Sequence, residues 1–504
     1  MKHYTLGEYV KLLEEKGMLA EYNLQGKDGE EIKLLTYDSR EVTQGTLFIC
    51  KGAAFKAEYL KNSMNQGAVC YVSEKKYELE KEVPYILVKG IRDAMAVLAN
   101  FFYNKPWEDL AVIGFGGTKG KSTSTYYMKA VVDDYLAAQD KPESAVISTI
   151  DIYDGKSKVE SHITTPEAVE LQMHLRNALD CNIEYAEMEI SSQALKYGRV
   201  DEMQFDVSVF LNISEDHISP IEHPDFEDYF QSKMKMFEKS KIAVVNLDAD
   251  YIDQILEASK AAGEVVTFST KNPEADYYAY NIHKEGKDIH FSVKCEAFDE
   301  EFVLTMPGFF NVENALGVVA ASVKLGIPTE YIHSGLRRAR SSGRMEFYHS
   351  KDHEVMAIVD YAHNKLSFEK LFSAMKEEFP DYGLVAIFGC PGKKSLLRRK
   401  YLGTIAGQYS KMVYLVAEDP GYEPVEDISK EIAQYVEAQK CPYKMIEDRG
   451  EAIKDAIETA EGKTLLLVTG KGAETRQKYG CEYLDCPSDV EYVQRYLAEY
   501  DSRH

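Results

Sequence analysis

The sequence predicts an α/β protein of three domains, and three observations lead to that prediction. The length of 504 residues suits about three domains of ordinary size. Short apolar runs alternate with helical stretches along most of the chain, which is typical of sheets covered by helices. The pattern of apolar runs and helical stretches changes near residues 106 and 341. We therefore expect an N-terminal domain of residues 1–106, a central domain of 107–341 and a C-terminal domain of 342–504.

The N-terminal segment contains short apolar runs at 46–50 and 68–72, which predict a mixed α/β domain. Pro106 discourages a helix from running into the next segment. In the central segment, the apolar run 110–114 leads into a glycine-rich loop and a helix is expected at 122–136. Residues 206–214 alternate at period two, and 242–246 form another apolar run. These strands and helices predict a parallel sheet.

The C-terminal segment repeats this rhythm and predicts an open, doubly wound sheet. Ligands of such sheets bind at the carboxyl ends of the strands, so the residues that follow each strand are the first candidates for a site. The expected strands are 355–360, 384–389, 412–417, 443–446 and 464–469, and the candidate loops begin near Asp360, Gly389, Glu418 and Gly470.

The composition excludes several classes of partner. The chain has 83 acidic and 59 basic residues and a formal net charge of −24, so nucleic acids and anionic membranes would repel it. No apolar run is long enough for a transmembrane helix, and the first residues lack a signal-peptide core. The eight cysteines include no CxxC pair. We expect a monomeric cytoplasmic protein.

A phosphate-binding loop is predicted at residues 114–122, between a strand and a helix. Backbone N–H groups of such a loop and the helix N-terminus bind phosphate oxygens, Lys121 adds a positive charge, and Ser122 can bind Mg²⁺. Phe115 stands where the strict Walker pattern has its first glycine. The alternative is a simple glycine-rich turn, but the strand–loop–helix context favours a nucleotide site.

Many short motifs, in the same order along nearly the whole chain, resemble those of the Mur ligases, the ATP-dependent enzymes that build the peptide stem of peptidoglycan. The motifs are Tyr37-Asp-Ser-Arg40, Gly117-Thr-Lys-Gly-Lys-Ser122, Thr164-Thr-Pro166, Glu189-Ile-Ser-Ser192, Asn212-Ile-Ser-Glu-Asp-His217, Asn311-Val-Glu-Asn-Ala315, Gly343-Arg-Met-Glu346, Asp360-Tyr-Ala-His363 and Gly470-Lys-Gly-Ala-Glu474. The resemblance implies a central P-loop ATPase-like domain and a Rossmann-like C-terminal domain.

Within the family, the sequence looks most like the members that add a diamino acid to UDP-N-acetylmuramoyl-L-alanyl-D-glutamate. The implied reaction forms an amide through an acyl phosphate, with ATP and Mg²⁺. L-Lysine is the expected amino acid, and meso-diaminopimelate is the second candidate. A folylpolyglutamate-synthase-like ligase is a competing hypothesis, and a non-catalytic nucleotide-binding subunit is a competing hypothesis from a different functional class.

The resemblance also implies the roles of individual residues. Lys121, Glu189, His217 and Lys233 are the expected catalytic residues, and Ser122, Glu189, His217 and carbamylated Lys233 the expected Mg²⁺ ligands. For a strand-end glutamate or a lone histidine a structural role is the common one, and an arbitrary helical lysine is usually on the surface. The expected ATP-binding residues are Gly117, Thr118, Lys119, Gly120, Lys121, Ser122, Thr123, Asn314, Arg344, Asp360 and His363.

The expected substrate-binding residues are Ser39, Arg40, Thr164, Thr165, Ser191, Arg199, Glu418, Asp419, Gly470 and Glu474. Relatives that use diaminopimelate carry an arginine after the third strand of the C-terminal domain, where this chain has Gly421. The acids Glu418, Asp419 and Glu474 would suit the bare ε-ammonium of lysine and repel a second carboxylate. A cation from Lys394, Arg398 or Arg476 could reverse that preference.

Overall fold

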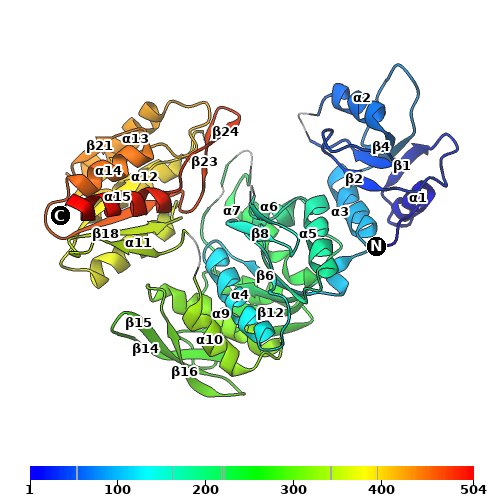
Figure 1. Cartoon of the computed structure of the whole chain (residues 1–504). Coiled ribbons are helices and arrows are strands. Elements are labelled where there is room, and N and C mark those ends of the chain that lie inside the picture. Colours follow the sequence, from blue (N-terminus) through cyan, green and yellow to red (C-terminus); the bar gives the residue numbers. More distant parts are fainter. Residues whose placement is uncertain are drawn as a thin grey trace.

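The computed structural model describes residues 1–52, 55–161, 163–216, 218–219, 222–340, 343–393 and 396–503. Three α/β bodies follow one another along the chain, and the N- and C-terminal bodies flank the central one (Figure 1). Each body is built around its own sheet, so the predicted fold class is confirmed. None of the helices in these ranges is both long and apolar enough to span a membrane.

The N-terminal body has a five-stranded sheet in the order β1-β5-β4-β3-β2, in which only β1 is antiparallel to its neighbour. Its core includes Ala168 and Val169 of a helix of the central body, so the two bodies share apolar packing. Its elements are α1 (Leu6–Glu15), β1 (Leu19–Asn23), β2 (Leu34–Thr36), β3 (Thr46–Ile49), α2 (Ala57–Gln66), β4 (Ala68–Ser73), β5 (Tyr85–Val88) and α3 (Ile91–Phe102).

The central body has an eleven-stranded sheet in the order β16-β15-β14-β13-β12-β11-β6-β10-β7-β8-β9. The strands from β14 to β7 in this order are parallel, whereas β15–β16 and β8–β9 extend its two ends as antiparallel strands. Its elements are η1 (Pro106–Glu108), β6 (Ala111–Gly116), α4 (Lys121–Ala137), β7 (Ala145–Ile147), β8 (Asp151–Tyr153), β9 (Lys158–Glu160), α5 (Ala168–Asp180), β10 (Tyr185–Glu189), α6 (Ser192–Lys196), β11 (Phe205–Phe210), α7 (Phe226–Met234), η2 (Phe237–Lys239), β12 (Ser240–Asn246), α8 (Ile252–Ser259), β13 (Glu264–Ser269), β14 (Tyr277–Glu285), β15 (Asp288–Lys294), β16 (Asp299–Leu304), α9 (Phe310–Lys324) and α10 (Thr329–Arg338).

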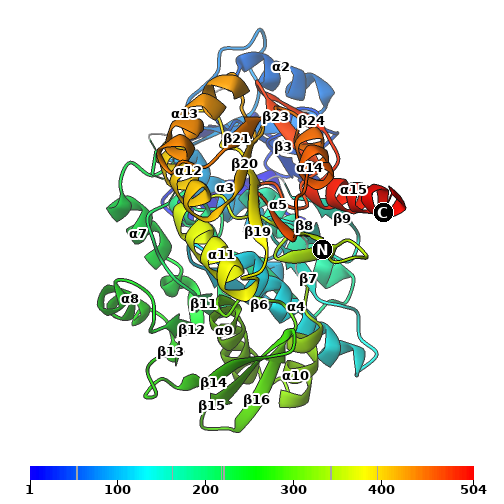
Figure 2. The same ribbon diagram turned by 90° about the vertical axis from the view of Figure 1, so that its left-hand side faces the viewer.

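The C-terminal body has a six-stranded sheet in the order β17-β18-β22-β19-β20-β21, parallel except for β17, and a separate β23–β24 hairpin. Helices α11, α12 and α13 cover one face, and α14 and α15 cover the other (Figure 2). Its elements are β17 (Glu346–His349), β18 (Val355–Asp360), α11 (Lys365–Glu378), β19 (Gly383–Phe388), α12 (Leu397–Tyr409), β20 (Met412–Leu415), α13 (Val425–Ala438), β21 (Tyr443–Met445), α14 (Arg449–Glu458), β22 (Thr464–Thr469), β23 (Arg476–Tyr479), β24 (Glu482–Asp485) and α15 (Asp489–Arg503).

One central strand differs from its sequence prediction. The alternating segment 206–214 predicted a strand to residue 214, but β11 ends at Phe210. Val207 and Val209 face one core and Phe205 the other, so both faces of β11 are buried and the alternation does not mark a solvent face. The four residues that follow β11 form a loop against the phosphate-binding loop.

Candidate active site

The phosphate-binding loop joins β6 to α4, and its shape requires glycine at two positions. Gly117 and Gly120 have φ angles of 137° and 85°, which residues with a Cβ rarely adopt. A Cβ on Gly120 would also lie 2.2 Å from Oδ1 of Asn314. The loop therefore comes close to α9, and α4 begins at Lys121 with its free backbone N–H groups at the loop.

The loop that follows β11 holds the phosphate-binding loop in place. Asn212 Oδ1 accepts from the Lys119 backbone N–H at 2.8 Å, and its Nδ2 donates to the Lys119 carbonyl at 3.0 Å. The Thr118 hydroxyl lies 2.9 Å from the Tyr229 hydroxyl of α7 and accepts from the Ser214 N–H at 3.0 Å. Sequence reasoning did not select Asn212, although it opens one of the motifs that carry the family resemblance.

Three lysines converge on this loop. The carboxylates beside them carry too little negative charge to balance all three. Lys121 Nζ and Lys233 Nζ both donate to the carbonyl of Gly117, at 3.1 and 2.7 Å. Burial lowers the pKa of Lys119 to about 7 and that of Lys121 below its usual value, with the neighbouring cations adding to both shifts. A bound polyphosphate would supply the missing negative charge. The lysines and the glycine cradle therefore fit a nucleoside triphosphate.

Lys233 is not the surface residue that an arbitrary helical lysine would be. Its residue is only 2% exposed, and burial lowers the pKa of its amine well below the ordinary range, with Lys121 as a further cause. Asp225 caps the N-terminus of α7, where its carboxylate accepts from the Asp228 N–H, and the last turn of this helix brings Lys233 under the loop. The surface interpretation is wrong because α7 packs directly on the phosphate-binding loop.

Glu189 ends β10 and is buried beside the loop, with 1% of the residue exposed. Its Oε1 accepts from the Thr149 N–H at 2.8 Å, and its charge acts on Lys121. His217 lies outside the described residues. Within the described ranges, no three His, Cys, Asp or Glu side chains gather as a metal-binding group.

Arg344 connects the C-terminal body to the phosphate-binding loop. Its Nη2 donates to the Ser122 hydroxyl at 3.0 Å, and its guanidinium lies 4.4 Å from the centre of the Tyr361 ring. Asp360, at the end of β18, accepts from the backbone N–H groups of Met345 and Ala362. Burial raises the pKa of Asp360 above its usual value.

A pocket of about 100 Å³ opens between these elements and the loop. Six of the predicted ATP-binding residues line it: Lys119, Gly120, Thr123, Asn314, Arg344 and Asp360. His363 does not line it. Its environment is instead set by Lys119, Arg398 and Asp216, and burial lowers its pKa well below 6.5. Asp216 binds Lys119 at 3.5 Å and Arg398 at 3.1 Å, and so joins the central and C-terminal bodies.

The predicted substrate residues of the central body form one hydrogen-bonded cluster. Thr165 Oγ1 donates to the Glu189 carbonyl at 2.8 Å and lies 3.2 Å from the Ser191 hydroxyl. Arg199 Nη1 donates to the Thr165 carbonyl at 3.1 Å, and its Nη2 forms an ion pair with Glu167 at 2.9 Å. Glu167 also binds Lys51 of the N-terminal body, while Thr164 accepts from Thr149.

Ser39 and Arg40 lie apart from this cluster, in the N-terminal body. Arg40 is exposed and pairs with Asp38. A larger hollow of about 610 Å³ in the same body is lined by other residues, among them Gly52, Phe55, Tyr77 and Arg92. Arg92 stacks on Tyr197 of the central body, 4.0 Å from the ring centre. The sequence analysis did not select these residues as site residues.

The predicted acids of the C-terminal body do converge, at the carboxyl ends of β20 and β22. Gly470 has a φ of 104°, and a Cβ there would lie 2.2 Å from Oε2 of Glu418. Burial raises the pKa of Glu418 to about 7. Asp419 and Glu474 share one partner that the sequence prediction overlooked, because Lys471 binds Asp419 at 3.0 Å and Glu474 at 2.5 Å.

The two ion pairs of Lys471 correct the prediction that Glu418, Asp419 and Glu474 are all available to an ammonium group. Lys471 is 4% exposed and neutralises part of the cluster, so Glu418 is the one of the three predicted acids without an ion-pair partner in the described part of the chain. Two candidate extra cations are engaged elsewhere, since Arg398 binds Asp216 and Arg476 binds Glu160 at 3.1 Å. Lys394 lies outside the described residues.

Comparison with known proteins decides the family. The Mur ligase middle domain model matches residues 116–322, and the Mur ligase glutamate ligase domain model matches residues 343–472. A protein of Enterococcus faecalis named UDP-N-acetylmuramoyl-L-alanyl-D-glutamate–L-lysine ligase is 38% identical over 89% of this chain and 88% of its own. The chain belongs to the Mur ligase family. It is accordingly an ATP-dependent, ADP-forming ligase.

Two further relatives extend the match over the full length. The UDP-N-acetylmuramyl-tripeptide synthetase of Lactobacillus acidophilus is 31% identical over 99% of this chain and 98% of its own. A solved UDP-N-acetylmuramoyl-L-alanyl-D-glutamate–2,6-diaminopimelate ligase matches with a TM-score of 0.66 and 23% identity, covering 100% of both chains. At that identity the solved structure supports the fold of a Mur ligase and no finer statement.

Proposed function

We propose that this Mur ligase joins a diamino acid, L-lysine, to the D-glutamate carboxylate of UDP-N-acetylmuramoyl-L-alanyl-D-glutamate. The observation that carries the proposal is a chain of contacts from the phosphate-binding loop to the acid cluster. Ser122 contacts Arg344, Arg344 stacks on Tyr361, and Tyr361 lines one pocket together with Glu474. A small pocket lies between them and is also lined by Lys471 and Thr149.

This arrangement would bring the reacting groups together. ATP supplies the phosphoryl group that turns the unreactive carboxylate into an acyl phosphate. Lys121 and the N–H groups at the start of α4 would bind the triphosphate, and Arg344 would neutralise charge on the transferring group. The acid cluster would hold the diamino acid so that its reacting amine faces the same pocket.

Mg²⁺ and the carbamate of Lys233 belong to this proposal. Ser122, Glu189 and His217 would hold the ions, and buried Glu189 beside Lys121 fits a cation that balances phosphate charge. A neutral lysine amine reacts with CO₂ to give a carbamate and a proton. The lowered pKa of Lys233 favours the neutral amine. The carbamate would supply an oxygen ligand for a second ion.

The preference for L-lysine is supported by charge. Glu418 would pair with the ε-ammonium, and Gly421, which follows Pro420 in this turn, offers no cation for a second carboxylate. Lys471 weakens this argument because it already neutralises Asp419 and Glu474. Meso-diaminopimelate therefore stays the second candidate. The names of the lysine-adding relatives at 37–38% identity favour lysine.

The remaining parts of the proposal concern the nucleotide substrate and the setting. The cluster of Thr165, Ser191 and Arg199 would bind the muramoyl-peptide, and Ser39, Arg40 and the hollow of the N-terminal body its uridine nucleotide. We propose domains of residues 1–106, 107–341 and 342–504, a monomer, and a cytoplasmic location, where ATP and nucleotide-linked precursors are available.

The test is phosphate release from ATP by the purified full chain. We expect release only when Mg²⁺, UDP-N-acetylmuramoyl-dipeptide and L-lysine are all present, with a tripeptide product identified by mass spectrometry. Omitting the lysine or the dipeptide in turn provides the controls. Phosphate release without either acceptor, or with a folate substrate in place of the muramoyl-dipeptide, would contradict the proposal.

A further inference from the structure

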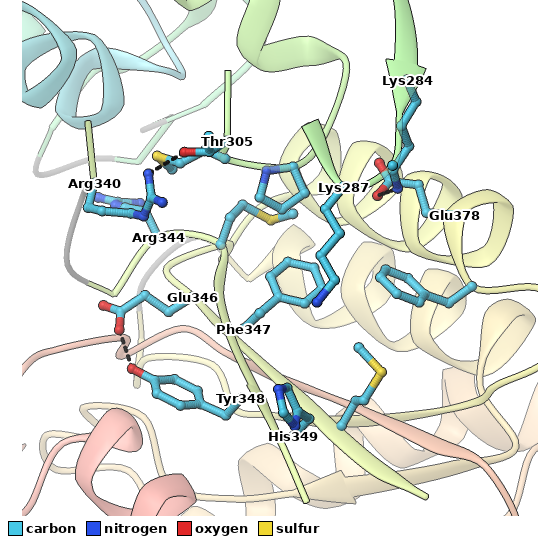
Figure 3. Close-up of a pocket in the computed structure, with 16 residues that line it drawn as sticks. Lys284, Lys287, Thr305, Arg340, Arg344, Glu346, Phe347, Tyr348, His349 and Glu378 are labelled. Carbon is cyan, nitrogen blue, oxygen red and sulfur yellow. Dashed lines mark hydrogen bonds and ion pairs between the residues drawn. The ribbon is translucent and has the colours of Figure 1, made fainter. Parts of the chain in front are cut away.

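A second interdomain pocket lies away from the nucleotide pocket, between the β14–β15 hairpin of the central body and the start of the C-terminal body (Figure 3). Its volume is about 540 Å³, within the range of about 300–1,000 Å³ that small-molecule sites occupy. Lys287 and Arg340 line it from the central body, and Phe347 and Phe379 line it from the C-terminal body. The proposed reaction does not involve this pocket. Of the predicted site residues, Arg344 lines it.

The interior surface of this hinge pocket is rich in apolar side chains. Met306 and Met345 are buried, and the other members are half-buried, so a ligand could cover further apolar surface. Methionine and phenylalanine side chains adapt to flat aromatic and aliphatic bodies. The apolar lining consists of Met306, Pro307, Met345, Phe347, Met356 and Phe379.

The charged side chains around the hinge pocket are mainly basic, although the chain has a net charge of −24. Both acids of the lining already have partners, because Glu378 binds Lys284 at 3.0 Å and Glu346 accepts from the Tyr348 hydroxyl. Within the described ranges, Arg340 donates only to Thr305 and to backbone carbonyls. Among the described residues, Lys287 and Arg340 have no carboxylate partner.

Figure 3 shows how these two cations lie. Arg340 stands on one side with its guanidinium at Thr305, and Lys287 extends across the pocket toward Phe347. An anionic group between them would gain two cationic partners, while the rest of the ligand covered the apolar lining. A neutral ligand would leave both cations without a partner, and a cation would be repelled.

We propose that the hinge pocket binds a small anionic amphiphile, that is, a flat apolar body carrying one carboxylate, sulfonate or phosphate group. The site is separate from the nucleotide pocket, with Arg344 and Met345 as the residues common to both linings. Because the walls of the hinge pocket come from two bodies, binding of a ligand there is linked to movement of the domains. A domain arrangement that raises the affinity of the pocket for its ligand is itself favoured by the bound ligand, by the same factor. The proposal does not depend on which amino acid the enzyme adds.

The test uses anilinonaphthalenesulfonate, a fluorescent anionic amphiphile, and its uncharged analogue phenylnaphthylamine. With the full chain we expect saturable binding of one anionic dye per protein and at least tenfold weaker binding of the neutral dye. Lys287→Glu should weaken the anionic dye about tenfold, and Arg340→Met about fivefold. Thermal unfolding of each variant should match the unmodified protein, because both side chains are exposed.

Lys294→Glu is the matched control, since Lys294 ends the same hairpin in β15 but does not line the pocket. It makes the same charge change and should leave dye affinity within about twofold. Equal affinity of Lys287→Glu and the unmodified protein would overturn the proposal. So would equal affinity for the two dyes, or competitive displacement by ADP that Lys287→Glu does not alter, because that pattern assigns the dye to the nucleotide pocket.

Discussion

Lys233→Met is the substitution that best separates the chemical role of Lys233 from its structural role. Methionine keeps the length and apolar stem of the side chain but can neither form a carbamate nor donate a hydrogen bond. The Gly117 carbonyl would lose its 2.7 Å hydrogen bond from Lys233 and keep the 3.1 Å one from Lys121. This carbonyl is therefore not left without a partner.

The expected effect on stability is small for this reason. Loss of one hydrogen bond costs about 1 kcal/mol, and the cost of burying an amine beside Lys121 disappears at the same time. The free energy of unfolding should change by no more than about 1 kcal/mol. Lys233→Ala removes the buried stem as well, and the cavity should cost about 2–4 kcal/mol. Activity should fall by at least about 100-fold in both variants, since the proposed carbamate ligand of the second ion would be lost.

The assay combines calorimetric unfolding with ADP release in the presence of saturating dipeptide and L-lysine. Removal of CO₂ from the buffer should lower the activity of the unmodified enzyme, and bicarbonate should restore it. Added acetate should partly restore Lys233→Ala, whose cavity can admit a small carboxylate, but not Lys233→Met, which fills that space.

Activity of Lys233→Met within about threefold of the unmodified enzyme would refute the reasoning. A large loss of activity together with a loss of several kcal/mol of stability in Lys233→Met would also refute it, because the side chain would then be mainly structural. If CO₂ had no effect on the activity of the unmodified enzyme, the carbamate hypothesis would be refuted, and the amine of Lys233 itself would have to act in the reaction.

Three further predictions concern the acid cluster and the domains. The pKa of Glu418 is raised from 4.5 to about 7, so the folded state binds the extra proton and loses this stabilisation as pH rises from about 4.5 to 7. Glu418→Gln should flatten that part of the unfolding profile, and KM for lysine should fall through the same pH range only in the unmodified enzyme. Lys471→Met should release Asp419 and Glu474 and raise the ratio of kcat/KM for L-lysine over meso-diaminopimelate about tenfold, and an unchanged ratio would show that Lys471 does not set the pocket charge. Small-angle scattering should show a smaller radius of gyration with an ATP analogue and the muramoyl-dipeptide, and an unchanged value would count against domain closure.

The sequence predicted best those elements whose pattern is local. Two apolar runs, 355–360 and 464–469, correspond to β18 and β22 residue for residue, because both are buried central strands bounded by polar turns. The phosphate-binding loop was equally clear, since its glycines and the following helix are neighbours in the chain. The sequence analysis missed the antiparallel strands β8–β9 and β15–β16. These strands have no distinctive composition, and they belong to the sheet because they pair with neighbouring strands.

The amino-acid sequence by itself determined the fold class, the phosphate-binding loop and the acids at the strand ends of the C-terminal body. Only the tertiary structure decided how these groups are charged and paired. Lys233 is buried because α7 packs under the loop, and Lys471 neutralises two of the acids because β20 and β22 end at the same edge of the sheet. Such contacts join residues far apart in the chain, and their energies depend on burial, which no local pattern specifies.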